Sequence, residues 1–264
     1  MIKSFLIFVF FVLFIVSLLI YLFQRQLIYF PSREIPNRSL FQAEDMQEIS
    51  LPTTDGLKLL AWFKPAFPNK PTLLYLHGNA GHIGHRMTLI RQLLSTGFGV
   101  FLLEYRGYGG NKGKPSEQGL YIDARSAVHF LEQQGVPPQH LVVYGESLGT
   151  GVAVKMASEF QICALILQSP FSSLSAVARY HYPWIFIRPS DKFNSLALID
   201  IIKAPLLILH GKSDPVVPFD QGLELYNQAI EPKKMIAFDN KGHNNLWDYQ
   251  FAFEIINFIH SNCS

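Results

Sequence analysis

The sequence predicts an α/β fold in which a mostly parallel central sheet is flanked by helices and preceded by one N-terminal transmembrane helix. Three observations support this prediction: six short apolar stretches, amphipathic stretches of helical length between them, and a long uncharged segment at the N-terminus. Apolar stretches without polar alternation are typical of parallel strands buried on both faces. Strands that alternate with helices indicate a parallel sheet. With 264 residues, 49% of them hydrophobic, the chain can bury one sizeable core.

The N-terminal segment has the length and composition of a membrane span. From Phe5 to Phe23 it carries no charged residue. At 1.5 Å per residue a helix of this length extends about 28 Å, close to the ~30 Å hydrocarbon core of a bilayer. A cleaved signal peptide is the alternative, but its apolar stretch is shorter and ends in small residues. We therefore expect residues 1–30 to form a retained anchor. Aromatic residues expected at the membrane interface are Tyr21, Tyr29 and Phe30.

The basic residues that flank this segment bear on its orientation. Lys3 precedes the span, whereas Arg25, Arg33 and Arg38 follow it. Because positive charge accumulates on the cytoplasmic side, this small bias favours a cytoplasmic location for the following domain.

Residues 31–264 are expected to form a single globular domain. Two short stretches at 47–51 and 57–63, joined by a turn-rich segment, predict an antiparallel hairpin. The expected parallel strands are 72–76, 98–104, 141–144, 164–167, 206–209 and 235–238. The expected helices are 83–95, 117–134, 148–159, 220–230 and 246–259. Gly97 and Gly135 stand just past two of these helices, where C-cap glycines are common.

One connection, residues 169–204, is longer than the others and rich in aromatic residues. A crossover helix with a longer loop would explain it in structural terms alone. Long insertions in compact domains are usually functional. We therefore favour the second interpretation, in which this connection forms a small cap that covers a functional site.

Composition excludes several classes of protein. The net charge of +2 and the absence of long charged runs argue against nucleic-acid binding. Of the two cysteines, Cys163 lies in an apolar stretch and Cys263 is next to the C-terminus, so no disulfide framework is expected. His82 and His85 have no third ligand nearby, so no metal site is expected. No cofactor is implied, and we expect a monomer.

The strongest local motif is Gly-Glu-Ser-Leu-Gly at residues 145–149. It follows an expected strand and opens an expected helix, which is the setting of a G-x-S-x-G nucleophile elbow. The serine occupies a sharp turn, and glycines on both sides avoid the clashes that side chains would cause. Ser147 is therefore the candidate nucleophile.

A serine hydroxyl needs a base, and the elbow predicts a later acid followed by a histidine. Asp214 lies in the loop after the strand at 206–209, and His243 lies after the last expected strand. His243 would accept and return the proton, while Asp214 would fix its tautomer. Asp200 and Asp239 are rival acids with a poorer position relative to the strands.

An oxyanion hole is expected beside the elbow. The backbone N–H of Leu148, directly after the nucleophile, supplies one donor, and that of Asn79 is the candidate for the second. The alternative for residues 77–81 is a plain turn between a strand and a helix.

These motifs resemble those of the α/β-hydrolase superfamily from about residue 47 to the C-terminus. More narrowly, the chain is similar to membrane-anchored alpha/beta hydrolase domain proteins. The shared motifs are His-Gly-Asn at 77–79, Tyr-Arg-Gly-Tyr-Gly at 105–109, His-Gly-x-x-Asp-x-x-Val-Pro at 210–218 and Gly-His-Asn at 242–244. The resemblance implies the hydrolase fold, a Ser-Asp-His triad, a structural role for residues 105–109, and ester, thioester or peptide-like substrates.

The leading hypothesis is a serine hydrolase that cleaves a small-molecule or lipid-linked lipophilic acyl ester or thioester through an acyl-enzyme. The anchor and the aromatic connection favour it. One alternative is a membrane-anchored serine peptidase of the aminopeptidase-like kind, which would need acidic residues near the site. Residues 169–204 offer only Asp191 and Asp200. A non-catalytic lipid-binding pseudo-hydrolase is the other alternative, although such proteins usually lose a triad member.

Overall fold

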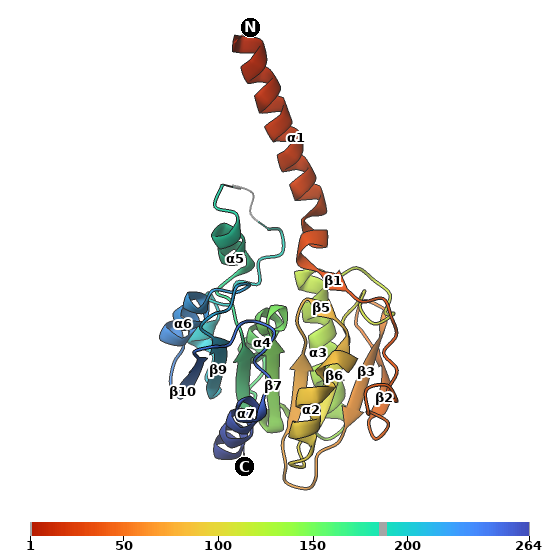
Figure 1. Ribbon diagram of the computed structural model, residues 1–264. Helices are drawn as coiled ribbons and strands as arrows, with labels where there is room; N and C mark the ends of the chain where they lie inside the picture. The colour runs from red at the N-terminus through yellow and green to blue at the C-terminus, as the bar shows by residue number, and fades with distance from the viewer. Residues whose placement is uncertain (1, 185–188, 264) are drawn as a thin grey trace.

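The computed structural model describes residues 2–184 and 189–263, and an eight-stranded sheet forms its centre (Figure 1). The strand order is β10-β9-β8-β7-β4-β6-β3-β2. The strands are β2 Gln47–Pro52, β3 Lys58–Lys64, β4 Thr72–Leu76, β6 Gly99–Leu103, β7 Leu141–Glu146, β8 Ala164–Gln168, β9 Leu206–Gly211 and β10 Lys233–Phe238. Strands β6 to β10, with β4, run parallel, and β3 pairs antiparallel with both β2 and β6. Both the expected hairpin and the six expected parallel strands are confirmed.

Helices cover both faces of the sheet and create two hydrophobic cores. Helices α3 Glu117–Gln133 and α4 Leu148–Glu159 pack on one face, and α2 Met87–Leu94 and α7 Tyr249–Asn262 on the other (Figure 1). Helix α6 Phe219–Gln228 adds Leu225 to the first core. Central strands such as β4 are buried at every residue, which explains their continuous apolar sequence.

Several helix boundaries differ from the expected ones, most of all those of the helices expected at 83–95 and 246–259. The stretch at 83–95 divides into a 3₁₀ turn, η1 Ile83–Arg86, followed by α2. The last helix starts at Tyr249 because the Asp248 side chain accepts a hydrogen bond from the Phe251 N–H at 2.9 Å and caps it. Gly97 and Gly135 adopt positive φ angles of 84° and 83°, as expected for residues that end helices.

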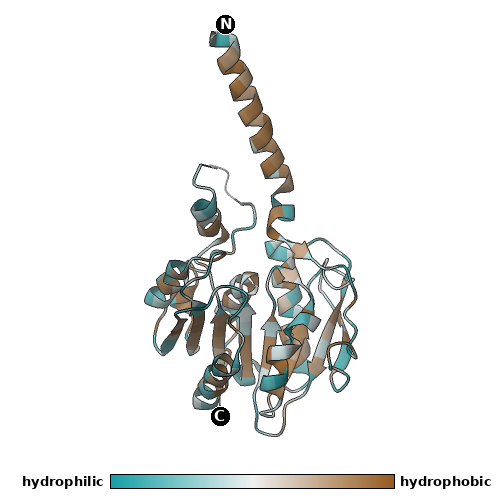
Figure 2. Cartoon of the chain, in the orientation of Figure 1, coloured by the Kyte–Doolittle hydropathy of each residue, from teal (hydrophilic) through white to brown (hydrophobic). Residues whose placement is uncertain are grey.

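An apolar helix, α1 Ile2–Ile28, projects away from the domain (Figures 1 and 2). It is long and apolar enough to cross a membrane, and the domain buries none of its most apolar window. A two-residue strand, β1 Phe30–Pro31, follows it and pairs with β5 Ala80–Gly81. The interface expected for Tyr29 is wrong, because this side chain is buried and its hydroxyl donates to Asp191 Oδ2 at 3.0 Å.

The connection at 169–204 carries helix α5 Leu174–His181 and the short turn η3 Ile199–Ile201. Helix α5 and helix α1 lie beyond the same edge of the sheet, at the top of the view in Figure 1. Residues 185–188, including the aromatic Phe186 of this connection, lie outside the described residues.

A disulfide joins Cys163, just before β8, to Cys263 at the end of α7, with their Cα atoms 5.8 Å apart. The expectation that these two cysteines form no disulfide was therefore wrong, because residues 100 positions apart meet only through the packing of α7 against the sheet. Disulfides typically contribute about 2–4 kcal/mol of stability.

Replacing Gly149 by alanine should destabilise the fold severely. A Cβ at this position would lie 2.0 Å from the backbone oxygen of Leu76, so α4 would have to move away from β4. We expect Gly149→Ala to lower the free energy of unfolding by about 3 kcal/mol or more. The control Lys155→Ala, on an outer position of the same helix, should change it by less than about 0.5 kcal/mol. Denaturant unfolding of the full chain in detergent micelles measures both; equal effects would contradict this account of the packing.

Candidate active site

Ser147 stands between strand β7 and helix α4 in a strained backbone conformation. Its φ is 49° and its ψ is −114°, a region that residues with a Cβ rarely adopt. The strain is held by packing, since a Cβ on Gly145 would lie 2.6 Å from the Gly149 carbonyl oxygen. The Ser147 N–H donates to the Gln168 carbonyl oxygen of β8 at 2.9 Å. This is the geometry of a nucleophile elbow.

His243 and Asp214 complete a hydrogen-bonded chain with Ser147. His243 Nε2 lies 2.9 Å from Ser147 Oγ, and its Nδ1 lies 2.7 Å from Asp214 Oδ2. The two loops that carry them are tied together, because the Ser213 N–H donates to the Lys241 carbonyl oxygen at 3.0 Å. The structure thus brings together three residues that are up to 96 positions apart.

Asp214 is fixed as a carboxylate by several donors. Its Oδ1 accepts hydrogen bonds from the backbone N–H groups of Val216 and Val217, both at 2.8 Å. Burial of this carboxyl disfavours the charge, but hydrogen bonds from His210 and His243 outweigh it and hold the pKa of Asp214 well below its ordinary value. His210, 3.4 Å from Oδ2, is a partner that the sequence did not single out as functional.

Neither rival acid approaches His243. Asp239 pairs with Lys212 at 2.6 Å, and its side chain is 75% exposed. Asp200 lies exposed in η3.

Two backbone groups expected to form an oxyanion hole flank Ser147. Leu148 is the first residue of α4, so its N–H has no partner within the helix. The loop from β4 passes close to Ser147, since a Cβ on Gly78 would lie 3.4 Å from Ser147 Cβ.

Hydrogen bonds of the Asn79 carbonyl oxygen and side-chain amide fix the orientation of this residue. Its carbonyl oxygen accepts from the Phe30 N–H and the Tyr108 hydroxyl, both at 2.9 Å. Its side-chain amide donates to the Ile28 carbonyl oxygen at 3.0 Å. Within the described residues, its backbone N–H donates to no protein acceptor.

The loop is supported from beneath by buried residues of the Tyr-Arg-Gly-Tyr-Gly segment. The His77 ring packs against Tyr105 and Tyr108, with ring centroids 4.3 and 5.2 Å away. His77 Nε2 lies 3.1 Å from Glu104 Oε1. These contacts agree with the structural role expected for residues 105–109.

A buried ion pair next to Ser147 was not predicted from the sequence. The Arg86 guanidinium donates to both oxygens of Glu146 at 2.9 and 3.0 Å, and the Tyr75 hydroxyl donates to Glu146 Oε2 at 2.9 Å. Burial disfavours the charge of Glu146, but Arg86 outweighs it and lowers the pKa of this carboxyl. The pair fixes the residue that precedes Ser147, and no local sequence pattern links residues 60 positions apart.

His82 and His85 stack on each other with ring centroids 3.9 Å apart. The Nδ1 atom of His82 accepts a hydrogen bond from the Gly84 N–H at 3.1 Å, so the ring caps a turn. Burial lowers the pKa of both rings. Within residues 2–184 and 189–263, no group of three or more potential ligands is positioned to hold a metal ion.

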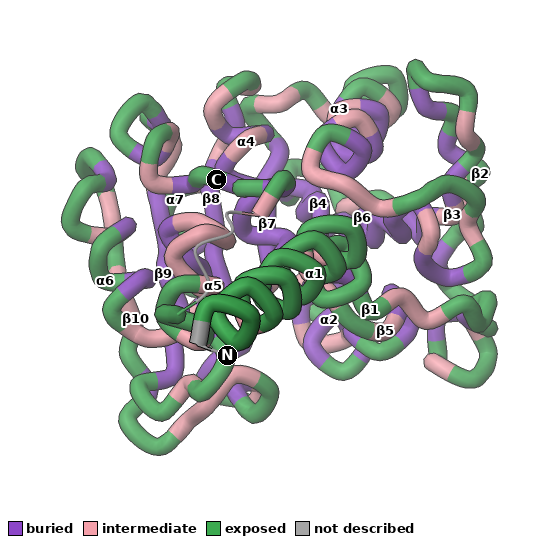
Figure 3. The backbone as a smooth tube through the Cα atoms, turned by 90° about the horizontal axis from the view of Figure 1, so that it is seen from above, coloured by how far each residue is buried: buried purple, intermediate pink, exposed green. Residues whose placement is uncertain are grey.

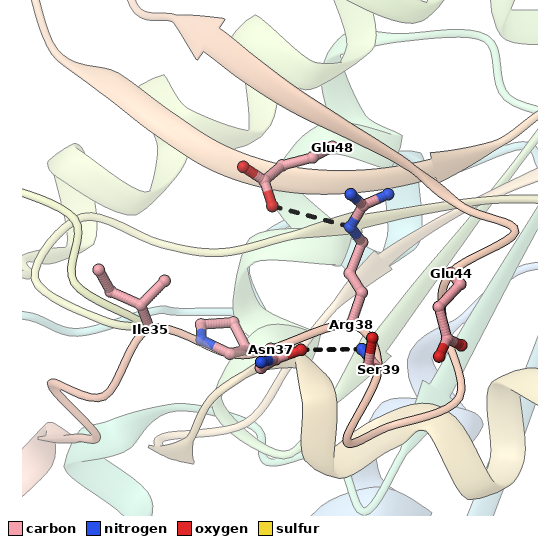
Figure 4. Close-up of a pocket in the computed structure, with 7 residues that line it drawn as sticks. Ile35, Asn37, Arg38, Ser39, Glu44 and Glu48 are labelled. Carbon is pink, nitrogen blue, oxygen red and sulfur yellow. Dashed lines mark hydrogen bonds and ion pairs between the residues drawn. The ribbon is translucent and has the colours of Figure 1, made fainter.

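A surface hollow in the linker after β1 shares no residue with this site (Figure 4). Its lining is Ile35, Pro36, Asn37, Arg38, Ser39, Glu44 and Glu48. Arg38 lies 3.8 Å from Glu48, and the Ser39 N–H donates to the Asn37 side chain at 2.9 Å. No residue of the Ser147–His243–Asp214 chain lines this hollow.

Comparison with known proteins identifies the family. A family model described as "Serine aminopeptidase, S33" matches residues 68–198. The protein Rv2307c of Mycobacterium tuberculosis is 40% identical over 228 residues, covering 84% of this chain and 81% of that one. The lysophosphatidylserine lipase ABHD12 of Danio rerio is 37% identical over 199 residues, covering 66% and 51%.

Among solved structures, the esterase Pf2001 of Pyrococcus furiosus superimposes with a TM-score of 0.74 at 23% identity, covering 89% of this chain and 100% of that one. The chain belongs to the α/β-hydrolase superfamily, and its fold is the α/β-hydrolase fold. Membership of this family supports hydrolase activity.

Removing Arg86 should destabilise the fold, because the charge on Glu146 would remain buried without its partner. We expect Arg86→Ala to lower the free energy of unfolding by about 3–5 kcal/mol, because a buried carboxylate loses its partner. The double variant Arg86→Met/Glu146→Gln should recover most of this loss, since the amide carries no charge and still accepts from Tyr75. The loss in Arg86→Ala should also shrink as the pH falls, because protonated Glu146 needs no cation. A pH-independent loss, measured by denaturant unfolding, would contradict the ion-pair explanation.

Proposed function

We propose that this protein is a serine hydrolase that cleaves lipophilic acyl esters or thioesters through Ser147, His243 and Asp214. The observation that carries the proposal is the hydrogen-bonded chain of these three side chains at a strained elbow. A serine hydroxyl in such a chain is activated by the imidazole, which is itself oriented by the carboxylate.

The reaction follows from the positions of these groups. As Ser147 Oγ attacks the carbonyl carbon, its proton passes to His243 Nε2, and the carbonyl oxygen gains negative charge. The N–H groups of Leu148 and Asn79 are the proposed donors to this oxygen. His243 then gives the proton to the leaving group, and an acyl-enzyme remains on Ser147. A water molecule, deprotonated by His243, releases the acid and restores the hydroxyl.

The ester class is supported by the relatives and by the chain itself. An esterase shares its fold, and a lysophosphatidylserine lipase is among its sequence relatives. The apolar helix α1 would hold the domain next to a bilayer, where lipophilic acyl compounds are concentrated.

The family model's description favours a serine aminopeptidase as the second candidate. Recognition of a free amino terminus needs an acidic group that is open to substrate. Asp191 is buried and paired with Arg25 at 2.9 Å, so it is not open to substrate. This pairing weighs against the peptidase. A pseudo-hydrolase is disfavoured because all three groups of the reactive chain are present.

We propose that α1 is retained as an anchor and that the domain faces an oxidising compartment. The positive-inside rule gave a small preference for the cytoplasm. The disulfide between Cys163 and Cys263 weighs more, because disulfides rarely persist in a reducing cytosol.

Activity of site variants tests the proposed function. Ser147→Ala should abolish turnover of p-nitrophenyl esters, and Asp214→Asn should lower kcat by about four orders of magnitude because the tautomer of His243 is lost. Asp239→Asn is the matched control and should keep wild-type activity. Undiminished turnover in Ser147→Ala, or a large loss in Asp239→Asn, would overturn the assignment of these residues.

The same assay with esters of increasing chain length separates the substrate classes. We expect Ser147-dependent kcat/KM to rise with acyl length, since each buried methylene contributes ~0.8 kcal/mol of transfer free energy. Turnover confined to acetate and butyrate would contradict a lipophilic pocket and favour the peptidase.

The redox state of the cysteines tests the location. In protein alkylated directly from cells, we expect Cys163 and Cys263 to react with a maleimide only after reduction. Cys163→Ser, which leaves Cys263 without its partner, should be labelled without reductant. Labelling of the wild-type thiols without reductant would place the domain in the cytoplasm instead.

A further inference from the structure

The end of α1 is joined directly to the loop beside the nucleophile. Strand β1, which follows α1, pairs with β5 of this loop. The Asn79 side chain donates to the Ile28 carbonyl oxygen at 3.0 Å, and the Phe30 N–H donates to the Asn79 carbonyl oxygen at 2.9 Å. Helix α1 therefore leaves the domain at the carboxyl edge of the sheet, the edge on which Ser147 stands (Figure 1).

A second set of contacts fixes α1 to the connection at 169–204. The Arg25 guanidinium donates to both oxygens of Asp191 at 2.9 and 3.2 Å, and the Tyr29 hydroxyl donates to the same carboxylate. Gln24 Oε1 accepts from the Ser190 N–H at 2.6 Å. Asp191 is only 4% exposed, whereas the Arg25 side chain is 52% exposed. The contacts of Arg25, Tyr29 and Asp191, here called the Asp191 latch, therefore join the end of α1 to a carboxylate that is buried in the domain.

Helix α5 is held between this latch and the candidate catalytic acid. At its start, the Leu174 N–H donates to the Lys192 carbonyl oxygen at 2.8 Å, next to Asp191. At its end, His181 Nε2 lies 2.8 Å from the Val216 carbonyl oxygen, and the Val216 N–H donates to Asp214. Helix α5 thus has a fixed place beside both α1 and the reactive groups.

Among the described residues, helix α5 and the residues just after it expose three aromatic side chains. Tyr180, Tyr182 and Trp184 are 64%, 54% and 69% exposed, and helix α5 buries none of its own residues. Seen from the α1 side in Figure 3, both α1 and α5 lie on the face turned to the viewer. Tyrosine and tryptophan are the residues enriched where a protein meets the headgroup layer of a membrane.

We propose that Tyr180, Tyr182 and Trp184 form a membrane-docking rim, seated in the headgroup interface of the bilayer that α1 spans. The partner is a lipid surface, and continuity with α1 through the Asp191 latch is the reason for choosing it over a protein. The rim holds the carboxyl edge of the sheet against the leaflet, so that an acyl ester reaches Ser147 from the bilayer. The delivery of an ester rests on the proposed hydrolase activity, whereas the seating of the rim rests only on the proposed retention of α1 as an anchor.

Tryptophan quenching tests the seating without any turnover. The full chain is reconstituted into phosphatidylcholine vesicles with or without bromine on the acyl chains near the headgroups. Of the three tryptophans, Trp62 is buried in the core and Trp247 is partly buried, where it donates to Gln168. We expect bromine-dependent quenching in the wild type and its loss in Trp184→Phe. Equal quenching in both proteins, or failure of the wild type to float with the vesicles, would overturn the proposal.

Kinetics test the consequence for substrate delivery. In Tyr180→Ser/Tyr182→Ser/Trp184→Ser, kcat/KM for a long-chain ester carried in vesicles should fall roughly tenfold, the equivalent of ~1.4 kcal/mol. Hydrolysis of dissolved p-nitrophenyl butyrate should stay at the wild-type level. Phe67→Ser is the matched control, because this exposed aromatic precedes β4 at the opposite edge of the sheet. An equal fall on both substrates, or the same fall in Phe67→Ser, would overturn the rim. Absence of Ser147-dependent turnover on either ester would count against the proposed function instead.

Discussion

The position of Ser147 depends on the close approach of helix α4 to the ends of β4 and β7. Gly145 and Gly149 permit this approach, because a Cβ at either position would overlap backbone atoms of the facing segment. With the helix so close, the chain must turn within one residue, and Ser147 takes a φ of 49°. The strain is therefore a consequence of packing, and it turns the hydroxyl out of the sheet toward His243.

Much of this architecture could be predicted from the sequence, for identifiable reasons. Strands such as β4 are buried on both faces, so their sequence is continuously apolar and marks them clearly. Ser147, Asp214 and His243 were located because each follows a strand end, and parallel strands bring their carboxyl ends to one edge. Helix ends were less predictable, since the start of α7 depends on the cap formed by Asp248.

Contacts that depend on how individual helices and loops pack could not be predicted. The Arg86–Glu146 pair, the His210–Asp214 contact and the Cys163–Cys263 bridge depend on how helices and loops pack, and no local pattern encodes them. Tyr29 shows the limit most clearly. An aromatic residue at the end of an apolar span is typical of a membrane interface. Here, however, its hydroxyl donates a hydrogen bond to the Asp191 carboxylate, 162 positions away, and the side chain is buried in the domain.

The apolar helix is thus part of the site's architecture as well as a candidate anchor. Its last turn supports Asn79 on one side and Asp191 on the other, so the loop beside Ser147 and the connection that carries α5 share one support. A change in the orientation of the domain relative to α1 would therefore act directly on the edge of the sheet where Ser147, Asp214 and His243 lie.

The central claim is that Ser147 is a nucleophile activated by its neighbours. Its most direct test is labelling of the full chain with a fluorophosphonate, which reacts with activated serines, followed by peptide mass spectrometry. The account predicts one phosphonylated peptide, modified at Ser147, and a strong loss of labelling in His243→Ala. Labelling at another serine, or no labelling of the folded protein, would contradict it.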